Sequence, residues 1–212
     1  IIEKYHPKMI NKIFKVGNSR IDVLKSPFNE LYHNQAKKIK EKYGNFILFP
    51  TLFTQSNAAS LYDKDIIEAL KNQGFKSDSP TVRVFVDLAK QQKEILKVMF
   101  EFFERFSKEC SNYKLIVRPH PSEKLDFWRN SLKKYNNIEV IFDHENTSSW
   151  IAASDLLIST NCTTAIEAFF LGKQSVNFLP FKNEDIEYKL PKNLSYVVRN
   201  LEDLLKIVKN KN

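Results

Sequence analysis

The chain of 212 residues has only two cysteines, Cys110 and Cys162. They form no CxxC pair and no cluster with histidine, which argues against a disulfide framework and against a zinc site. No uninterrupted apolar run reaches the ~18 residues of a membrane-spanning helix, and no signal peptide is visible. Zinc-finger, RNP and KH signatures and clusters of arginine are missing too, so we predict no nucleic-acid partner. These absences fit a protein of a reducing cytoplasm.

Apolar residues, by contrast, are plentiful. Hydrophobic residues make up 42% of the chain and include 17 phenylalanines, enough for a core and too many to remain in water. The formal net charge is +8, and it comes mainly from lysines spread along the chain. This charge fits either a solvated basic surface or attraction to anions, among them sugar nucleotides and the headgroups of an anionic membrane.

Short apolar runs alternate with amphipathic stretches from residue 31 onward. We expect strands over 46–50, 114–117, 138–142, 155–158 and 174–178. We expect helices over 31–44, 63–73, 80–110, 127–134, 147–153, 164–171 and 201–209. Nearer the start, Gly17-Asn18 predicts a tight turn between a strand end at Lys15-Val16 and a short apolar stretch. The alternation predicts an α/β fold with a Rossmann-like parallel sheet and helices on both faces.

Ligands of such sheets bind outside the carboxyl ends of the strands. Three loops therefore form the candidate site: those after Phe49, after Val117 and after Ile158.

The loop after Val117 reads Arg118-Pro119-His120-Pro121. An arginine and a histidine leave the end of a buried strand together, and the two prolines stiffen the turn that carries them. A guanidinium and an imidazole N–H both donate to phosphate oxygens. We therefore predict that this turn binds an anionic ligand, and an alternative is that His120 only caps neighbouring carbonyls.

The loop after Ile158 carries consecutive polar side chains and runs into a helix. They are Ser159, Thr160, Asn161, Cys162, Thr163 and Thr164. Backbone N–H groups at a helix start, together with hydroxyls, can bind phosphate. Thr164-x-x-Glu167 also fits a capping box, which needs no ligand. Cys162 is interpreted as a packing residue, because no histidine and carboxylate set is visible to activate it.

Two weaker candidates complete the set. The loop after Phe49 spans 51–57 and contributes Thr54 and Asn57. The acidic turn Asp143-His144-Glu145 adds a histidine that could reach a base or a ribose.

Several segments together resemble bacterial surface carbohydrate biosynthesis proteins. Residues 17–24 (GNSRIDVL) resemble a GNPRxDLL stretch of that family, with Ser19 where it usually has proline. Residues 46–57 (FILFPTLFTQSN) resemble the strand and loop that follow it. The best matches are 116–123 (IVRPHPSE) and 150–172 (WIAASDLLISTNCTTAIEAFFLG). The resemblance covers about 16–180.

The resemblance implies a GT-B glycosyltransferase, an enzyme with two Rossmann-like domains, of which this chain is the C-terminal, donor-binding one. Similar motifs occur in transferases of CMP-activated Kdo and sialic acid and in polyol-phosphate transferases of teichoic acid synthesis. By resemblance, Arg118 and His120 hold the donor phosphate, and Glu167 matches a carboxylate that binds ribose hydroxyls. The donor's phosphate and nucleotide end is lined by Ser159, Thr160, Asn161, Thr163 and Thr164.

The resemblance also implies a division of the chain. Residues 1–30 are expected to be a linker from an upstream acceptor domain, and 31–212 the sugar-nucleotide-binding domain. The start at Ile1-Ile2-Glu3-Lys4, without methionine, reads as the middle of a protein, so we expect that the acceptor domain lies upstream. A catalytic base is expected there, so none is named here. We predict no metal and no cofactor besides the nucleotide-sugar substrate.

Four functions stay open. The first is transfer of a sugar, from a CMP-sugar by preference, to a glycan or lipid-linked acceptor. The second is a CDP-polyol phosphotransferase, the third a sugar-nucleotide epimerase, and the fourth a nucleotide-sensing module without turnover. For all of them we expect a cytoplasmic protein, with peripheral contact to the inner face of the plasma membrane as a further possibility.

Overall fold

The computed structural model describes residues 7–14, 17–57 and 66–211. Its strands are β1 (Phe46–Pro50), β2 (Lys114–Arg118), β3 (Ile138–Val140), β4 (Leu156–Ser159), β5 (Ser175–Phe178) and β6 (Tyr196–Val198). Its helices up to β3 are η1 (Pro7–Lys12), α2 (Ser19–Asp22), α3 (Glu30–Tyr43), α4 (Ile66–Asn72), α5 (Pro80–Glu109) and α6 (Leu125–Leu132). Those after β3 are α7 (Thr147–Ala153), α8 (Thr164–Phe170), α9 (Lys189–Asn193) and α10 (Leu201–Lys209). None of the described helices is long and apolar enough to cross a bilayer.

The strands form one parallel sheet with the order β3-β2-β1-β4-β5-β6. The first strand is central: Leu48 is opposite Ile116 of β2 on one side and Leu157 of β4 on the other. Strands β2 and β3 lie on one side of β1, and the later strands β4, β5 and β6 lie on its other side. The reversal between β1 and β4 is the switch point at which open α/β sheets bind ligands.

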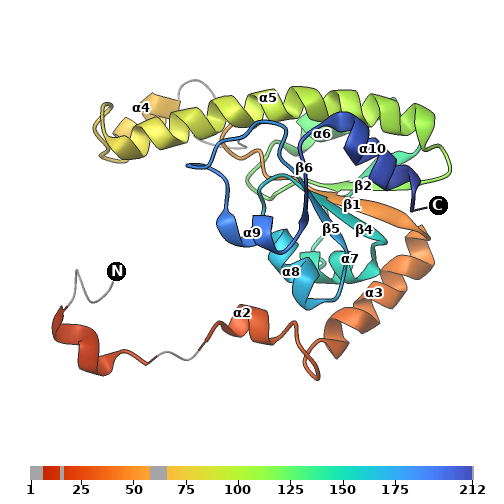
Figure 1. Cartoon of the computed structure of the whole chain (residues 1–212), viewed down its shortest axis with the longest axis horizontal. Helices are drawn as coiled ribbons and strands as arrows, with labels where there is room; N and C mark the ends of the chain where they lie inside the picture. Colours follow the sequence, from red (N-terminus) through yellow and green to blue (C-terminus); the bar gives the residue numbers. More distant parts are fainter. Residues whose placement is uncertain (1–6, 15–16, 58–65, 212) are drawn as a thin grey trace.

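Helices cover both faces of the sheet, because side chains alternate along each buried strand. Ile47 and Phe49 of β1 belong to the cluster made with α5, α6 and α10. Phe46 and Leu48 belong to the opposite cluster, made with α3, α7 and α8. Figure 1 shows these two layers, with the long α5 above the sheet and α3, α7 and α8 below it. The predicted fold class is confirmed.

The five predicted strands and seven predicted helices are present, with ends shifted by up to a few residues; 63–65 of the second helix lie outside the described residues. Helix α9 and strand β6 were not predicted. Strand β6 has only three residues, lies at the edge of the sheet and exposes Tyr196, so it leaves almost no apolar pattern in the sequence.

Residues 17–24 contain the expected turn and a short helix that was not predicted. Gly17 makes the turn, with φ of +85°, and helix α2 follows it. Asn18 caps helix α2 by accepting a hydrogen bond from the backbone N–H of Arg20 at 3.1 Å. Lys15 and Val16, the expected strand end, lie outside the described residues. Leu24 is 1% exposed and belongs to the α3–α7–α8 cluster, so this segment packs on the domain.

Candidate functional site

A cavity of about 520 Å³ opens at the carboxyl ends of β1, β2 and β3 and extends to the start of α8. Its walls come from the ends of β1 and β2, the turn after β2, the loop between β3 and α7, and the turn before α8. The lining residues are Pro50, Thr51, Arg118, Pro119, His120, Pro121, Phe142, Asp143, His144, Glu145, Asn146, Thr147, Cys162 and Thr164. We call it the strand-end cavity. All three predicted loops therefore contribute to one site, although the loop after Phe49 does so only through its first residue, Thr51.

His120 is half-buried at this cavity, and its ring has a defined hydrogen-bonding state. The backbone N–H of Ser122 donates to its Nδ1 at 3.1 Å, which assigns the ring proton to Nε2. Burial lowers the pKa of His120 below the usual 6.5, so the imidazole is uncharged at neutral pH. His120 therefore carries one N–H donor, on Nε2, for which the described residues supply no acceptor.

A buried carboxylate fixes the turn that carries His120. Glu123 Oε1 accepts from the backbone N–H of Phe53 at 2.8 Å, and Oε2 accepts from Trp128 Nε1 at 2.7 Å. Thr51 Oγ1 lies 2.9 Å from both carboxylate oxygens and also accepts from the backbone N–H of His120 at 3.2 Å. Burial raises the pKa of Glu123, and these donors oppose the shift. The network joins the loop after β1, the turn after β2 and helix α6 into one unit.

Arg118 lines the cavity, but its guanidinium already has protein partners. Nη1 donates to Asp143 Oδ1 at 2.7 Å, and Nη2 donates to the carbonyl of Glu145 at 3.0 Å. The guanidinium also lies 4.8 Å from the ring centroid of Trp150. Burial lowers the pKa of Arg118, and Asp143 opposes this. Arg118 thus holds the loop after β3 against the cavity, and its direct contact with phosphate stays a prediction.

The turn before α8 divides into residues with different surroundings. Thr164 and Cys162 line the strand-end cavity. The Thr164 side chain is 8% exposed, and its Oγ1 has no hydrogen-bond partner within the described parts of the chain. Burial raises the pKa of the Cys162 thiol, which fits the packing role predicted for it. Thr163 is exposed to solvent, and Ser159 is fully buried, with Oγ donating to the carbonyl of Val176 at 3.4 Å.

Asn161 has a structural task at this turn. Its φ of +56° is in the left-handed region, where asparagine is tolerated better than most residues. Its Nδ2 donates to the carbonyl of Ile186 at 2.9 Å, and its Oδ1 accepts from the backbone N–H of Tyr188 at 2.6 Å. Asn161 therefore ties the segment after β5 to the end of β4.

The capping-box interpretation of Thr164 and Glu167 is wrong. The N-cap of α8 is Thr163, one residue earlier, and no side chain caps the helix. The Glu167 carboxylate instead accepts from Arg20 Nη2 at 2.6 Å and from Ser148 Oγ at 2.7 Å. The capping pattern fails because the helix begins one residue earlier than the box requires, and the carboxylate is turned toward Arg20 and Ser148 instead of the N-cap backbone.

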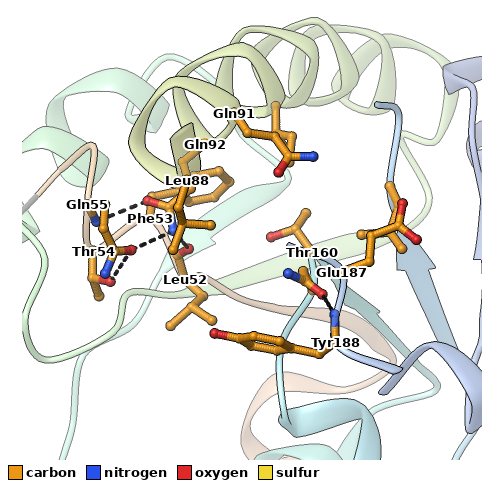
Figure 2. A pocket seen from close by; sticks show the side chains of 13 residues that line it. Leu52, Phe53, Thr54, Gln55, Leu88, Gln91, Gln92, Thr160, Glu187 and Tyr188 are labelled. Carbon is orange, nitrogen blue, oxygen red and sulfur yellow. Dashed lines mark hydrogen bonds between the residues drawn. The ribbon is translucent and has the colours of Figure 1, made fainter. Parts of the chain in front are cut away.

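A second, smaller cavity of about 90 Å³ lies at the switch point, on the α5 side. In Figure 2, Leu52, Phe53, Thr54 and Gln55 form one wall, and Thr160, Glu187 and Tyr188 face them across the gap. Gln92 of α5 fixes this loop by accepting from the backbone N–H of Gln55 at 3.0 Å. Thr54, Thr160 and Asn161 thus lie at this switch-point cavity. Asn57 is buried and lines neither of these two cavities.

Glu187 anchors the segment after β5 through two cations. It accepts from Arg199 Nη2 at 3.1 Å and from Lys192 Nζ at 2.9 Å. The Arg199 contact lowers the pKa of Glu187 to about 2. Since the pKa of the folded state is below that of the unfolded chain, Glu187 stabilises the fold above pH 4.5, and this contribution disappears as the pH falls through about 2.

Replacing Glu187 with glutamine should therefore lower the free energy of unfolding at pH 7 by about 1–3 kcal/mol, since charge-assisted hydrogen bonds are lost. The difference between the two proteins should shrink as the pH falls from 4.5 to 2. Urea unfolding of both proteins across this range measures it. A difference that stays constant with pH would contradict the ionised, paired state of Glu187.

Known proteins were compared with this chain in three ways. Protein-family models give no match, and curated proteins give no significant match. Solved structures do match. The UDP-GlcNAc 2-epimerase of Methanocaldococcus jannaschii, solved with UDP-GlcNAc and UDP, superposes with a TM-score of 0.53 at 17% identity, over 95% of this chain and 48% of that one. The chain has the fold of one GT-B half domain.

Two further structures show a more distant likeness to this GT-B half domain. The Escherichia coli heptosyltransferase WaaC, solved with ADP, has a TM-score of 0.47 at 10% identity, over 86% of this chain and 49% of that one. The wall teichoic acid polymerase TagF has a TM-score of 0.42 at 15% identity, over 95% of this chain and 44% of that one. The chain spans about half the length of each of the three proteins.

Sequence reasoning missed several residues that shape the site of this GT-B half domain. Glu123 is one of them: the sequence shows only that a glutamate follows the turn, two residues after Pro121, and its buried network is visible only in the structure. The contact between Arg20 and Glu167 could not be predicted from the sequence, because 147 positions separate the two residues. No group of three or more potential metal ligands occurs in the regions that the structure describes.

Proposed function

We propose that this GT-B half domain binds the nucleotide-activated donor of a glycosyltransferase of surface polysaccharide synthesis. The strand-end cavity carries the proposal. It unites the Nε2–H of His120 with the buried, unpartnered hydroxyl of Thr164, and both groups can donate to a phosphate oxygen. An unpaired buried hydroxyl costs free energy, which a bound ligand recovers. A CMP-sugar is the preferred donor, by resemblance of the motifs.

In the proposed reaction the sugar–phosphate bond breaks and negative charge grows on the leaving phosphate. Donors already fixed in place stabilise such charge without reorganising. His120 is fixed by Ser122 and by the Glu123 network, and it would hold that charge directly. Arg118 would act through its positive charge and by ordering the loop that begins at Asp143. The catalytic base would come from an acceptor domain, and the acceptor would be a glycan or a lipid-linked glycan.

Thermal-shift measurements with CMP, CDP, UMP, UDP and GDP test the binding step. At 100-fold excess over Kd, a ligand that binds only the folded state adds about 2.7 kcal/mol of stability. We expect one cytidine nucleotide to raise Tm most and His120→Ala to reduce that rise. The same Tm with every nucleotide would contradict the proposal.

The identity of the transferred group is a separate question. Incubation of the complete protein with radiolabelled CMP-sugar or CDP-glycerol, each with acceptor, shows whether a sugar or a polyol phosphate is transferred. We expect label in the glycan from the CMP-sugar. Conversion of the donor sugar without acceptor would instead identify an epimerase, and binding without turnover a nucleotide-sensing module. A cytoplasmic location with peripheral contact to an anionic membrane is part of the same proposal.

A further inference from the structure

Arg20 and Glu167 form an ion pair that joins the start of the chain to helix α8. Arg20 Nη2 lies 2.6 Å from Glu167 Oε1. The Arg20 side chain is 73% exposed, whereas the Glu167 side chain is 6% exposed. The segment that carries Arg20 is packed on the domain, because Leu24 of the same segment is buried among α3, α7 and α8.

The Glu167 carboxylate is oriented but not saturated. Oε1 accepts from Arg20 and Oε2 accepts from Ser148 Oγ at 2.7 Å. An ionised carboxylate offers about four acceptor positions, two on each oxygen. With these as the donors among the described residues, each oxygen keeps one position for a further donor, and a pair of neighbouring hydroxyls supplies two such donors.

Glu167 does not line the strand-end cavity itself, but it is close in sequence or contact to two residues that do, Thr164 and Thr147. It follows Thr164 by three residues on α8, which is about 5 Å along a helix axis. Its partner Ser148 follows Thr147 on α7, and both Thr147 and Thr164 line the cavity. A nucleotide with its phosphate at Thr164 would therefore bring its ribose toward Glu167.

We propose that Arg20 is a positioning residue for ribose recognition: it holds the Glu167 carboxylate in the orientation that a ribose ligand needs. This inference rests on the proposed function, with Glu167 as the ribose acceptor. Because Arg20 is mostly exposed, its ion pair contributes little to folding stability. Its effect is expected in ligand discrimination, since a hydroxyl bonded to a correctly placed carboxylate raises affinity about tenfold or more.

The experiment compares ribose with 2′-deoxyribose ligands by titration calorimetry. The probes are CMP and UMP and their 2′-deoxy forms. We expect the unchanged protein to bind the better ribonucleotide about tenfold more tightly than its deoxy form. Arg20→Gln should reduce this preference to about twofold or less, and Arg20→Lys should restore part of it. Glu167→Gln should remove the preference too, and the double variant should add nothing further.

The matched control is Lys25→Gln, a substitution of another exposed cation in the same segment. It should leave the ribose preference unchanged, and Tm should be similar in Arg20→Gln and Lys25→Gln. A tenfold preference that survives Arg20→Gln would overturn the inference, as would nucleotide binding by the unchanged protein with no ribose preference. Binding of none of the four probes would instead contradict the proposed function itself.

Discussion

Replacement of His120 with alanine in the complete protein should lower glycosyl-transfer turnover about 100-fold, since one fixed hydrogen-bond donor to a developing anion has an effect of this size. The ring presents a single N–H, on Nε2, because Ser122 occupies Nδ1. Donor affinity should fall as well, by a smaller factor, because the ground-state phosphate carries less charge at the leaving oxygen. Steady-state kinetics with the labelled donor, which separate kcat from KM, measure both effects.

A histidine on another surface provides the control. His33 lies exposed on α3, and His33→Ala should leave turnover unchanged. His120→Ala should also keep a Tm close to that of the unchanged protein, since His120 is only half-buried. Full turnover in His120→Ala would remove His120 from the site.

The largest effect on stability is expected for Glu123→Gln. A glutamine has the shape of the carboxylate but turns an NH₂ group toward either Trp128 Nε1 or the backbone N–H of Phe53, and both of these groups can only donate. Two buried donors that face each other leave both unsatisfied, at a cost of about 2–3 kcal/mol. For a chain of this size the corresponding fall in Tm is on the order of 5–10 °C.

Two further variants make this prediction specific. Glu101→Gln changes an exposed glutamate of α5 and should leave Tm unchanged within about 1 °C. Thr51→Val removes the one hydroxyl that links Glu123 to the backbone N–H of His120, so it should lower both Tm and donor binding. A Glu123→Gln protein as stable as Glu101→Gln would show that the buried network does not hold the turn.

The parts of the fold that the sequence predicted are those with the strongest local patterns. Strand β1 is five consecutive buried residues, and the apolar positions of α5 recur at three- and four-residue steps. Such patterns arise because each element must bury one face or both, so they are visible without the rest of the chain. The predicted meeting of the loops after β2 and β4 followed from one topological rule, since both strands flank β1.

The parts that could not be predicted depend on distant contacts. Whether Glu167 closes a capping box or pairs with Arg20 is decided by a segment 147 positions away. The engagement of Arg118 with Asp143 and the carbonyl of Glu145 likewise depends on where the loop after β3 packs. A motif thus located the site, while the hydrogen-bond partners inside it came from tertiary structure.

A crystal structure of the chain with CMP bound tests the central claim most directly. The account predicts the phosphate in the strand-end cavity, within 2.7–3.2 Å of His120 Nε2 and Thr164 Oγ1, the range of ordinary hydrogen bonds. A nucleotide at the amino ends of the strands instead, for example among Leu156, Ser175 and Tyr196, with no ligand contact to either donor, would contradict it.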